Sequence, residues 1–153
     1  MASLVLAFVL LLAIIFTGIL FDIIGVAAAA AREAGLHAKA ARRVMGARQA
    51  LNLVRHAHTV SSFCNDVVGD ICATLSGAIG AAIVFRLAGS AGGSALWASI
   101  LMTATISGLT IGGKAWSKGL AINQANEIIF QVGRLMAWVQ QATALLRQKK
   151  GKR

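Results

Sequence analysis

Three long apolar stretches constrain the fold of this chain more than any other feature. They cover about residues 3–27, 60–86 and 95–116, and each reaches the ~20 residues that a helix needs to cross a hydrocarbon core ~30 Å thick. Hydrophobic residues make up 58% of the 153 residues, far more than a soluble domain of this length needs. We therefore predict an all-α membrane protein in which residues 1–153 form a single domain with three transmembrane helices.

The first apolar stretch has some features of a cleavable secretory signal, because a run of alanines follows it. However, no Lys or Arg precedes the apolar core, the core exceeds the usual ~7 to 15 residues, and Asp22 interrupts it. We expect this segment to stay in the protein as a membrane anchor.

The distribution of positive charge predicts the orientation. Six Lys and Arg residues lie between the first and second stretches and eight follow the third, whereas only Arg86 lies on the other side. The positive-inside rule then places the N-terminus outside the cell membrane and the C-terminus in the cytoplasm. Together with attraction of basic segments such as 148–153 to anionic lipid head groups, this rule accounts for the net charge of +10. Nucleic acid is therefore not expected as a partner.

The cytoplasmic segment over residues 32–57 is predicted to be a helical hairpin. It is rich in Ala, Arg and Leu, and Gly35 and Gly46 are expected to divide it into short helices. Its apolar positions recur at helical spacing, which is typical of a helix that lies on the bilayer surface; they are Ala47, Ala50, Leu51 and Val54.

Three histidines lie in or beside this hairpin, namely His37, His56 and His58. We favour surface side chains near lipid head groups over a metal site, because no further ligands stand at metal-binding spacing.

Residues 120–147 are predicted to form a long amphipathic juxtamembrane helix. Its apolar stripe consists of Ile128, Ile129, Val132, Leu135, Met136, Val139, Ala142 and Leu146. Such a stripe fits either the membrane surface or a partner helix, and the sequence does not separate the two.

Small residues and tryptophans predict how the spans are packed and placed. Gly77 and Gly80 lie one turn apart on the second stretch, where they would let another backbone approach closely. Residues 88–94, "AGSAGGS", are expected to form an external turn. Trp97 and Trp116 bracket the third stretch and are expected at opposite membrane interfaces.

The two cysteines are predicted to be structural. Cys64 and Cys72 lie too far apart along one helix for a mutual disulfide, so we expect them to pack as small apolar residues.

The aspartates inside the apolar stretches are the main candidates for function. With ~1.5 Å of rise per residue, Asp66 and Asp70 lie roughly 9 and 15 Å in from the cytoplasmic side, and Asp22 roughly 8 to 12 Å. Thr110 and Ser107 lie about 9 and 14 Å in on the third helix, so all three helices put oxygen ligands at a similar depth. An ionised carboxylate facing lipid costs roughly 2.5 to 3.5 kcal/mol, so these groups are expected to face one another or water. Hard oxygen ligands of this kind suit Mg²⁺ with several retained waters. The predicted cation site comprises Asp22, Asn65, Asp66, Asp70, Ser107 and Thr110.

A structural role for the same residues stays open. The aspartates would then be protonated packing residues, or would hydrogen-bond to Ser and Thr hydroxyls and hold the helices together.

The order of three segments is similar to that in a known family. "FTGILFDIIGVAAAAAREAGLHAKAARRVMGARQALNLV", "HTVSSFCNDVVGDIC" and "ISGLTIGGKAWSKGLAINQANEIIFQVGRLMAWV" together resemble the transmembrane domain of the CNNM/CorB/CorC magnesium and cobalt transporters. The resemblance covers nearly the whole chain. It implies three spans, a cytoplasmic hairpin after the first, an Asn-bearing second span, a juxtamembrane helix after the third, and a homodimer.

Matched residue by residue, the resemblance assigns Thr17 or Asp22 to the polar position of the first span and Asn65 to the second-span Asn. "TIGGKA" over residues 110–115 falls where the family has a Gly-Glu-x-x-Pro-Lys motif, with Lys114 retained. The chain has no Glu on the third span, no Pro, no CBS pair and no CorC domain, so nucleotide regulation is not expected.

Two functions follow from these observations. The first is a minimal bacterial magnesium-transporter-like protein that binds Mg²⁺ at the carboxylates, and the second is a non-transporting membrane scaffold or accessory subunit. An enzyme is not expected, because no nucleophile and base stand together in a recognisable pattern.

Overall fold

The structure, a computed structural model, describes residues 2–88 and 95–150. The described residues are helical throughout apart from short breaks, and no strand occurs among them. The predicted external turn over residues 88–94 therefore lies almost wholly outside the described residues, as does the end of the basic tail. The helices are α1 Ala2–Ala30, α2 Glu33–Ala41, α3 Ala47–Arg55, α4 Ala57–Ser62, the π-helix η1 Phe63–Val68, α5 Gly69–Ala88, α6 Ala95–Asn123 and α7 Ala125–Lys150.

Three of the described helical segments are long and apolar enough to cross a membrane, as predicted. They are Leu4–Ala30, Ala57–Leu87 and Leu96–Asn123. The last of these extends beyond the predicted end at residue 116, because α6 continues without a break to Asn123.

The chain divides into two compact units. Unit 1 comprises Met1–Ile23 and Phe63–Gly119, and unit 2 comprises Ile24–Ser62 and Leu120–Arg153. The boundaries fall inside α1 and α6, so each long helix contributes to both units. The single domain predicted from the sequence stays a prediction.

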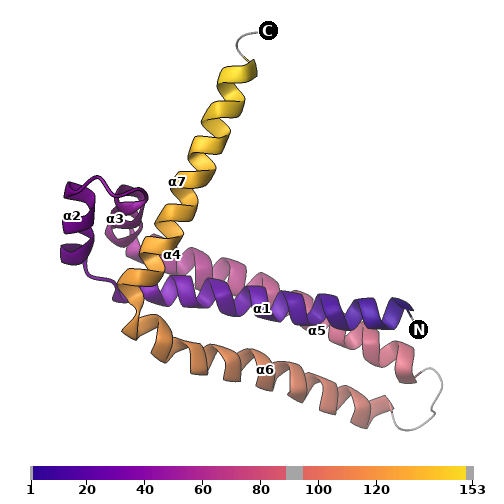
Figure 1. The fold of residues 1–153 in the computed structure, drawn as a ribbon. Helices are drawn as coiled ribbons and strands as arrows, with labels where there is room; N and C mark the ends of the chain where they lie inside the picture. The colour runs from indigo at the N-terminus through magenta and orange to yellow at the C-terminus, as the bar shows by residue number, and fades with distance from the viewer. Residues whose placement is uncertain (1, 89–94, 151–153) are drawn as a thin grey trace. The chain divides into compact units, whose positions relative to one another are not determined.

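Unit 1 consists of three long helices that lie alongside one another (Figure 1). Leu11 and Ile15 of α1, Ile83 of α5 and Ile106 of α6 form its buried apolar cluster. Many large apolar side chains point outward instead, including Trp97 and Trp116. An apolar exterior of this kind suits contact with lipid.

Small residues set the close contacts in unit 1. A side chain at Gly80 would overlap the end of Ile106, and one at Gly18 would lie 3.1 Å from Cβ of Cys72. Cys72 therefore packs as predicted, whereas Gly80 makes room for a side chain of α6 and not for the predicted backbone. The prediction for Gly77 is wrong, because no atom lies within 4 Å of the space where its Cβ would be.

In unit 2, α2 and α3 pack against α7 (Figure 1). Gly46 ends the turn between α2 and α3 with a φ of +88°, a backbone conformation that glycine adopts without strain. The predicted break at Gly46 is confirmed, whereas Gly35 lies inside α2. The break before α2 occurs instead at Arg32, whose extended backbone donates its N–H to Oδ1 of Asn126 at 2.7 Å.

The closest contact in unit 2 joins α3 to α7 through glycine. A Cβ at Gly133 would lie 2.5 Å from the carbonyl oxygen of Gly46 and 2.6 Å from the backbone nitrogen of Ala50. Ala47 and Ala50 are fully buried in this region. Part of the α3 face predicted to lie on the bilayer is thus buried within unit 2, and the placement of α2, α3 and α7 beside a membrane stays a prediction.

The packed face of α7 and its predicted apolar stripe overlap only in part. The buried residues of α7 are Ala125, Ile129, Phe130, Gly133 and Ala137, so Ile129 of the stripe is buried. Leu135, Met136 and Val139 of the stripe are exposed, and their contact with a membrane surface or a partner helix stays a prediction. Gly133 allows the backbone of α3 to come close to α7.

Candidate functional site

Asp22 and Lys114 form a charge pair inside unit 1. Asp22 lies in the C-terminal third of the Leu4–Ala30 segment, in an apolar run of α1, and only 5% of its surface is exposed. Its Oδ1 lies 3.7 Å from Nζ of Lys114 on α6. This distance exceeds the ~2.7 to 3.2 Å of an N–H to oxygen hydrogen bond, so the attraction is electrostatic.

The second carboxylate oxygen of Asp22 has no hydrogen-bond partner. Oδ2 is buried and lacks a protein donor. Buried polar atoms are nearly always hydrogen-bonded, and those that are not call for an explanation such as a bound water or ion. Asp22 therefore has one oxygen loosely paired with an ammonium group and one oxygen available to a ligand.

Gly69 provides the space for the Lys114 side chain. A Cβ at this first residue of α5 would lie 3.3 Å from Nζ of Lys114. Two close approaches of α1 to the other helices, at Gly18 against Cys72 and at Gly113 against Ile19, both lie on the N-terminal side of Asp22. Asp22, Gly69 and Lys114 bring α1, α5 and α6 together, and the common membrane depth of the predicted ligands stays a prediction.

The helix that precedes Gly69 is a π-helix. It covers Phe63–Val68 and includes Asn65 and Asp66, two of the predicted ligands. A π-helix is wider than an α-helix and redirects side chains, and short π segments are frequent at functional sites. Asn65 is half-buried here, whereas Asp66 is exposed.

The other predicted ligands differ from Asp22 in burial. Asp70 and Ser107 are exposed on unit 1, and the half-buried Thr110 donates its hydroxyl to the carbonyl of Ile106 at 2.8 Å. Among the described residues, no group of three or more His, Cys, Asp and Glu side chains is arranged to hold a metal ion. The six-residue ligand set stays a prediction, and Asp22 is its buried carboxylate.

Lys114 is the site residue that the sequence reasoning did not include. Lys114 matches the Lys of the family motif, but the charge distribution assigns it to the cytoplasmic cations. The signal was nevertheless present, because Lys114 lies in an apolar run of α6 and a charge in such a run needs a partner at the same depth.

The histidines of unit 2 are all exposed. His37 contacts Oε2 of Glu33 at 3.1 Å, and His56 contacts the carbonyl of Asn52 at 3.0 Å. Neither contact brings two histidines together.

Comparison with known proteins adds no relative. No family model matches the chain, and neither a curated protein nor a solved structure is significantly similar to it. The candidate site therefore rests on the chain's own chemistry.

Proposed function

We propose that this chain is a multi-pass cell-membrane protein that binds and transports a divalent cation, with Mg²⁺ as the preferred ion. The observation that carries the proposal is the buried Asp22, whose Oδ2 lacks a partner and whose Oδ1 is loosely paired with Lys114. An ionisable group in a membrane-spanning segment is costly, and such groups commonly line ion pathways.

Asp22 alone provides too few ligands for Mg²⁺. This ion uses one or two carboxylates and keeps several waters, so the proposed site is wet and needs a second carboxylate. Asp66 and Asp70 are the carboxylates on the exposed side of η1 and α5. In the proposed homodimer, with the N-terminus outside and the C-terminus in the cytoplasm, that side faces the second copy, and a half-buried Asn65 contributes an amide oxygen.

The test is the thermal stability of the detergent-purified full chain in a Mg²⁺ series, with Ca²⁺, Co²⁺ and Na⁺ for comparison. A ligand at one hundred times its dissociation constant stabilises the folded state by ~2.7 kcal/mol, so a saturable shift is measurable. Asp22→Asn should lose this shift and Asp70→Asn should weaken it, whereas the matched charge removal Glu127→Gln in unit 2 should keep it. A shift no larger than that of Na⁺ at equal ionic strength would contradict the cation site. If a saturable shift is found, an assay of flux into vesicles tests transport directly.

A second function, the non-transporting membrane scaffold, is favoured by Lys114 itself. Its ammonium already compensates the charge of Asp22 without any bound ion. In a scaffold, the double variant Asp22→Asn with Lys114→Met would be as stable as the native chain in every cation, because a buried ion pair is often replaceable by neutral residues. In a transporter, the same double variant would fold but lose cation-dependent stabilisation.

A further inference from the structure

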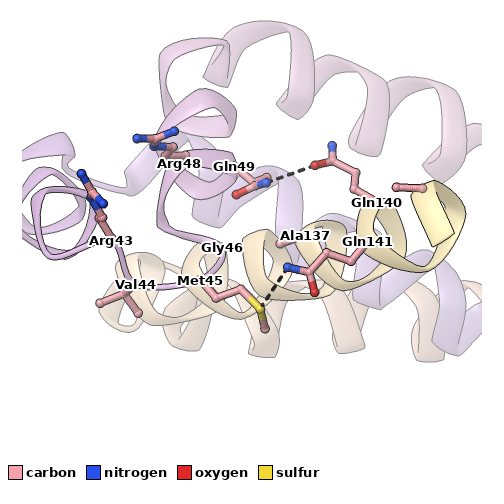
Figure 2. Close-up of a pocket in the computed structure, with 10 residues that line it drawn as sticks. Arg43, Val44, Met45, Gly46, Arg48, Gln49, Ala137, Gln140 and Gln141 are labelled. Atoms are coloured by element: carbon pink, nitrogen blue, oxygen red, sulfur yellow. Dashed lines mark hydrogen bonds between the residues drawn. The ribbon is translucent and has the colours of Figure 1, made fainter. Parts of the chain in front are cut away.

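A basic cavity lies in unit 2 between the α2–α3 turn and α7. Its volume is about 670 Å³, and Arg43 and Arg48 are among the residues that line it. Figure 2 shows both arginine side chains on the same side of the cavity, away from Gln140 and Gln141.

Amide side chains tie the walls of this cavity together. Gln49 donates to Oε1 of Gln140 at 3.1 Å, and Gln141 donates to the sulfur of Met45 at 3.8 Å (Figure 2). These contacts join the turn to α7 without using either guanidinium group. The cavity is therefore held in shape while its arginines stay available.

No acidic residue lines the cavity or neutralises its arginines. The two glutamates of unit 2 are already engaged elsewhere, since Glu33 pairs with His37 and Arg55 while Glu127 pairs with Lys39. Across the described residues, no carboxylate is paired with Arg43 or Arg48. Two neighbouring guanidinium groups without a counter-ion favour a phosphate, whose oxygens accept paired hydrogen bonds from arginine.

The surroundings of the arginines are apolar enough to indicate a lipid. Met45 also lines a second cavity of about 410 Å³, together with Leu135, Trp138, Gln131 and Arg134. Trp138 is 66% exposed, and tryptophan is enriched where a protein meets the head groups of a membrane. A free phosphate ion has no apolar part that could contact these side chains, whereas a phospholipid presents a phosphate and apolar chains together.

We propose that this cavity binds the phosphate of an anionic phospholipid through Arg43 and Arg48. The apolar part of the lipid then lies against Met45, which lines both cavities, and against Leu135 and Trp138 of the second cavity. The site is independent of the cation site in unit 1. The proposal assigns the general attraction of basic segments for anionic lipid to one cavity of unit 2.

Native mass spectrometry of the detergent-purified full chain tests this proposal, with phosphatidylglycerol and phosphatidylcholine as the added lipids. The native chain should retain phosphatidylglycerol and release phosphatidylcholine at the same concentration. Arg43→Gln with Arg48→Gln should bind phosphatidylglycerol roughly thirtyfold more weakly, which corresponds to about 2 kcal/mol. Both arginines are exposed, so the variant should fold.

The matched control removes the same charge from the same unit outside the cavity. Arg32→Gln with Arg42→Gln should bind phosphatidylglycerol like the native chain, because neither side chain lines the site. Equal losses in the two double variants would overturn the proposal, since binding would then follow net charge alone.

Two further arms separate a lipid from other anions. Trp138→Ala should weaken phosphatidylglycerol binding while leaving any effect of inorganic phosphate on thermal stability unchanged. Displacement of the lipid by millimolar inorganic phosphate, or unaltered lipid binding in Trp138→Ala, would contradict a lipid site. Preference for an acidic peptide over phosphatidylglycerol at equal charge would contradict it as well.

Discussion

Units 1 and 2 differ in the burial of their ion pairs and in what their glycines contact. Unit 1 buries its Asp22–Lys114 pair, whereas unit 2 keeps its Lys39–Glu127 pair at the surface. Glycines in unit 1 make room for side chains, as Gly80 does for Ile106, but Gly133 in unit 2 makes room for the backbone of α3. The difference teaches that the same residue types contribute differently to stability in the two units, according to whether they are buried or exposed.

The largest expected effect comes from breaking the buried pair of unit 1. Lys114→Met should destabilise unit 1 by about 3 to 5 kcal/mol, because it leaves the carboxylate of Asp22 buried without a counter-charge. Denaturant unfolding in detergent micelles, monitored by tryptophan fluorescence, measures the loss. Adding Asp22→Asn to Lys114→Met should restore most of the stability, and a single variant as stable as the native chain would show that the pair is solvated.

The second effect tests the backbone contact of unit 2. Gly133→Ala should cost about 1 to 3 kcal/mol, because the new Cβ would meet the backbone of Gly46 and Ala50 and neither can turn aside. Hydrogen exchange should show faster opening of α3, with unit 1 unaffected. The control Gly108→Ala, in open space on α6, should be neutral or stabilising by up to about 1 kcal/mol.

A smaller effect is expected where a glycine of unit 1 meets a side chain. Gly80→Ala should cost about 1 kcal/mol or less, because the end of Ile106 can move whereas a backbone cannot. Thermal unfolding in detergent measures it, and Ile106→Val should rescue part of the loss. A cost equal to that of Gly133→Ala would remove the distinction between the two kinds of contact.

The smallest effect belongs to the exposed charges of unit 2. Glu127→Gln breaks the 3.2 Å pair with Lys39 and should cost about 0.2 to 1 kcal/mol, because both side chains are well exposed. Lys39 also lies 4.0 Å from the ring centre of Phe130, so part of its contribution should survive. A double-mutant cycle with Lys39→Gln at two salt concentrations isolates the pair, and a coupling insensitive to salt would argue that the pair is buried in the native protein.

Some features of the fold follow from the sequence because they depend on one segment alone. The three membrane-length helices are of this kind, since length and apolar character do not depend on neighbours. The break at Gly46 is another, because the turn needs a positive φ. Gly35 shows the limit of such predictions. A glycine inside a helix costs only ~1 kcal/mol, and α2 continues through Gly35 despite this cost.

The missed features depend on two segments at once. Gly133 and Ala137 of α7 lie outside the predicted apolar stripe, and Gly133 is buried through the close approach of α3. The partner of Asp22 was missed because the register between α1 and α6 decides which cation is near it.

The sequence by itself determined that this chain is helical, that three segments can span a membrane, and that carboxylates lie inside two of them. Only the tertiary structure decided that Asp22 is the buried carboxylate and that Lys114 is its partner. It also decided that Oδ2 of Asp22 has no hydrogen-bond partner. The physical reason is that hydrophobicity adds up along a single segment, whereas an ion pair depends on distances of a few ångströms between helices. Those distances are set by contacts such as Gly113 against Ile19.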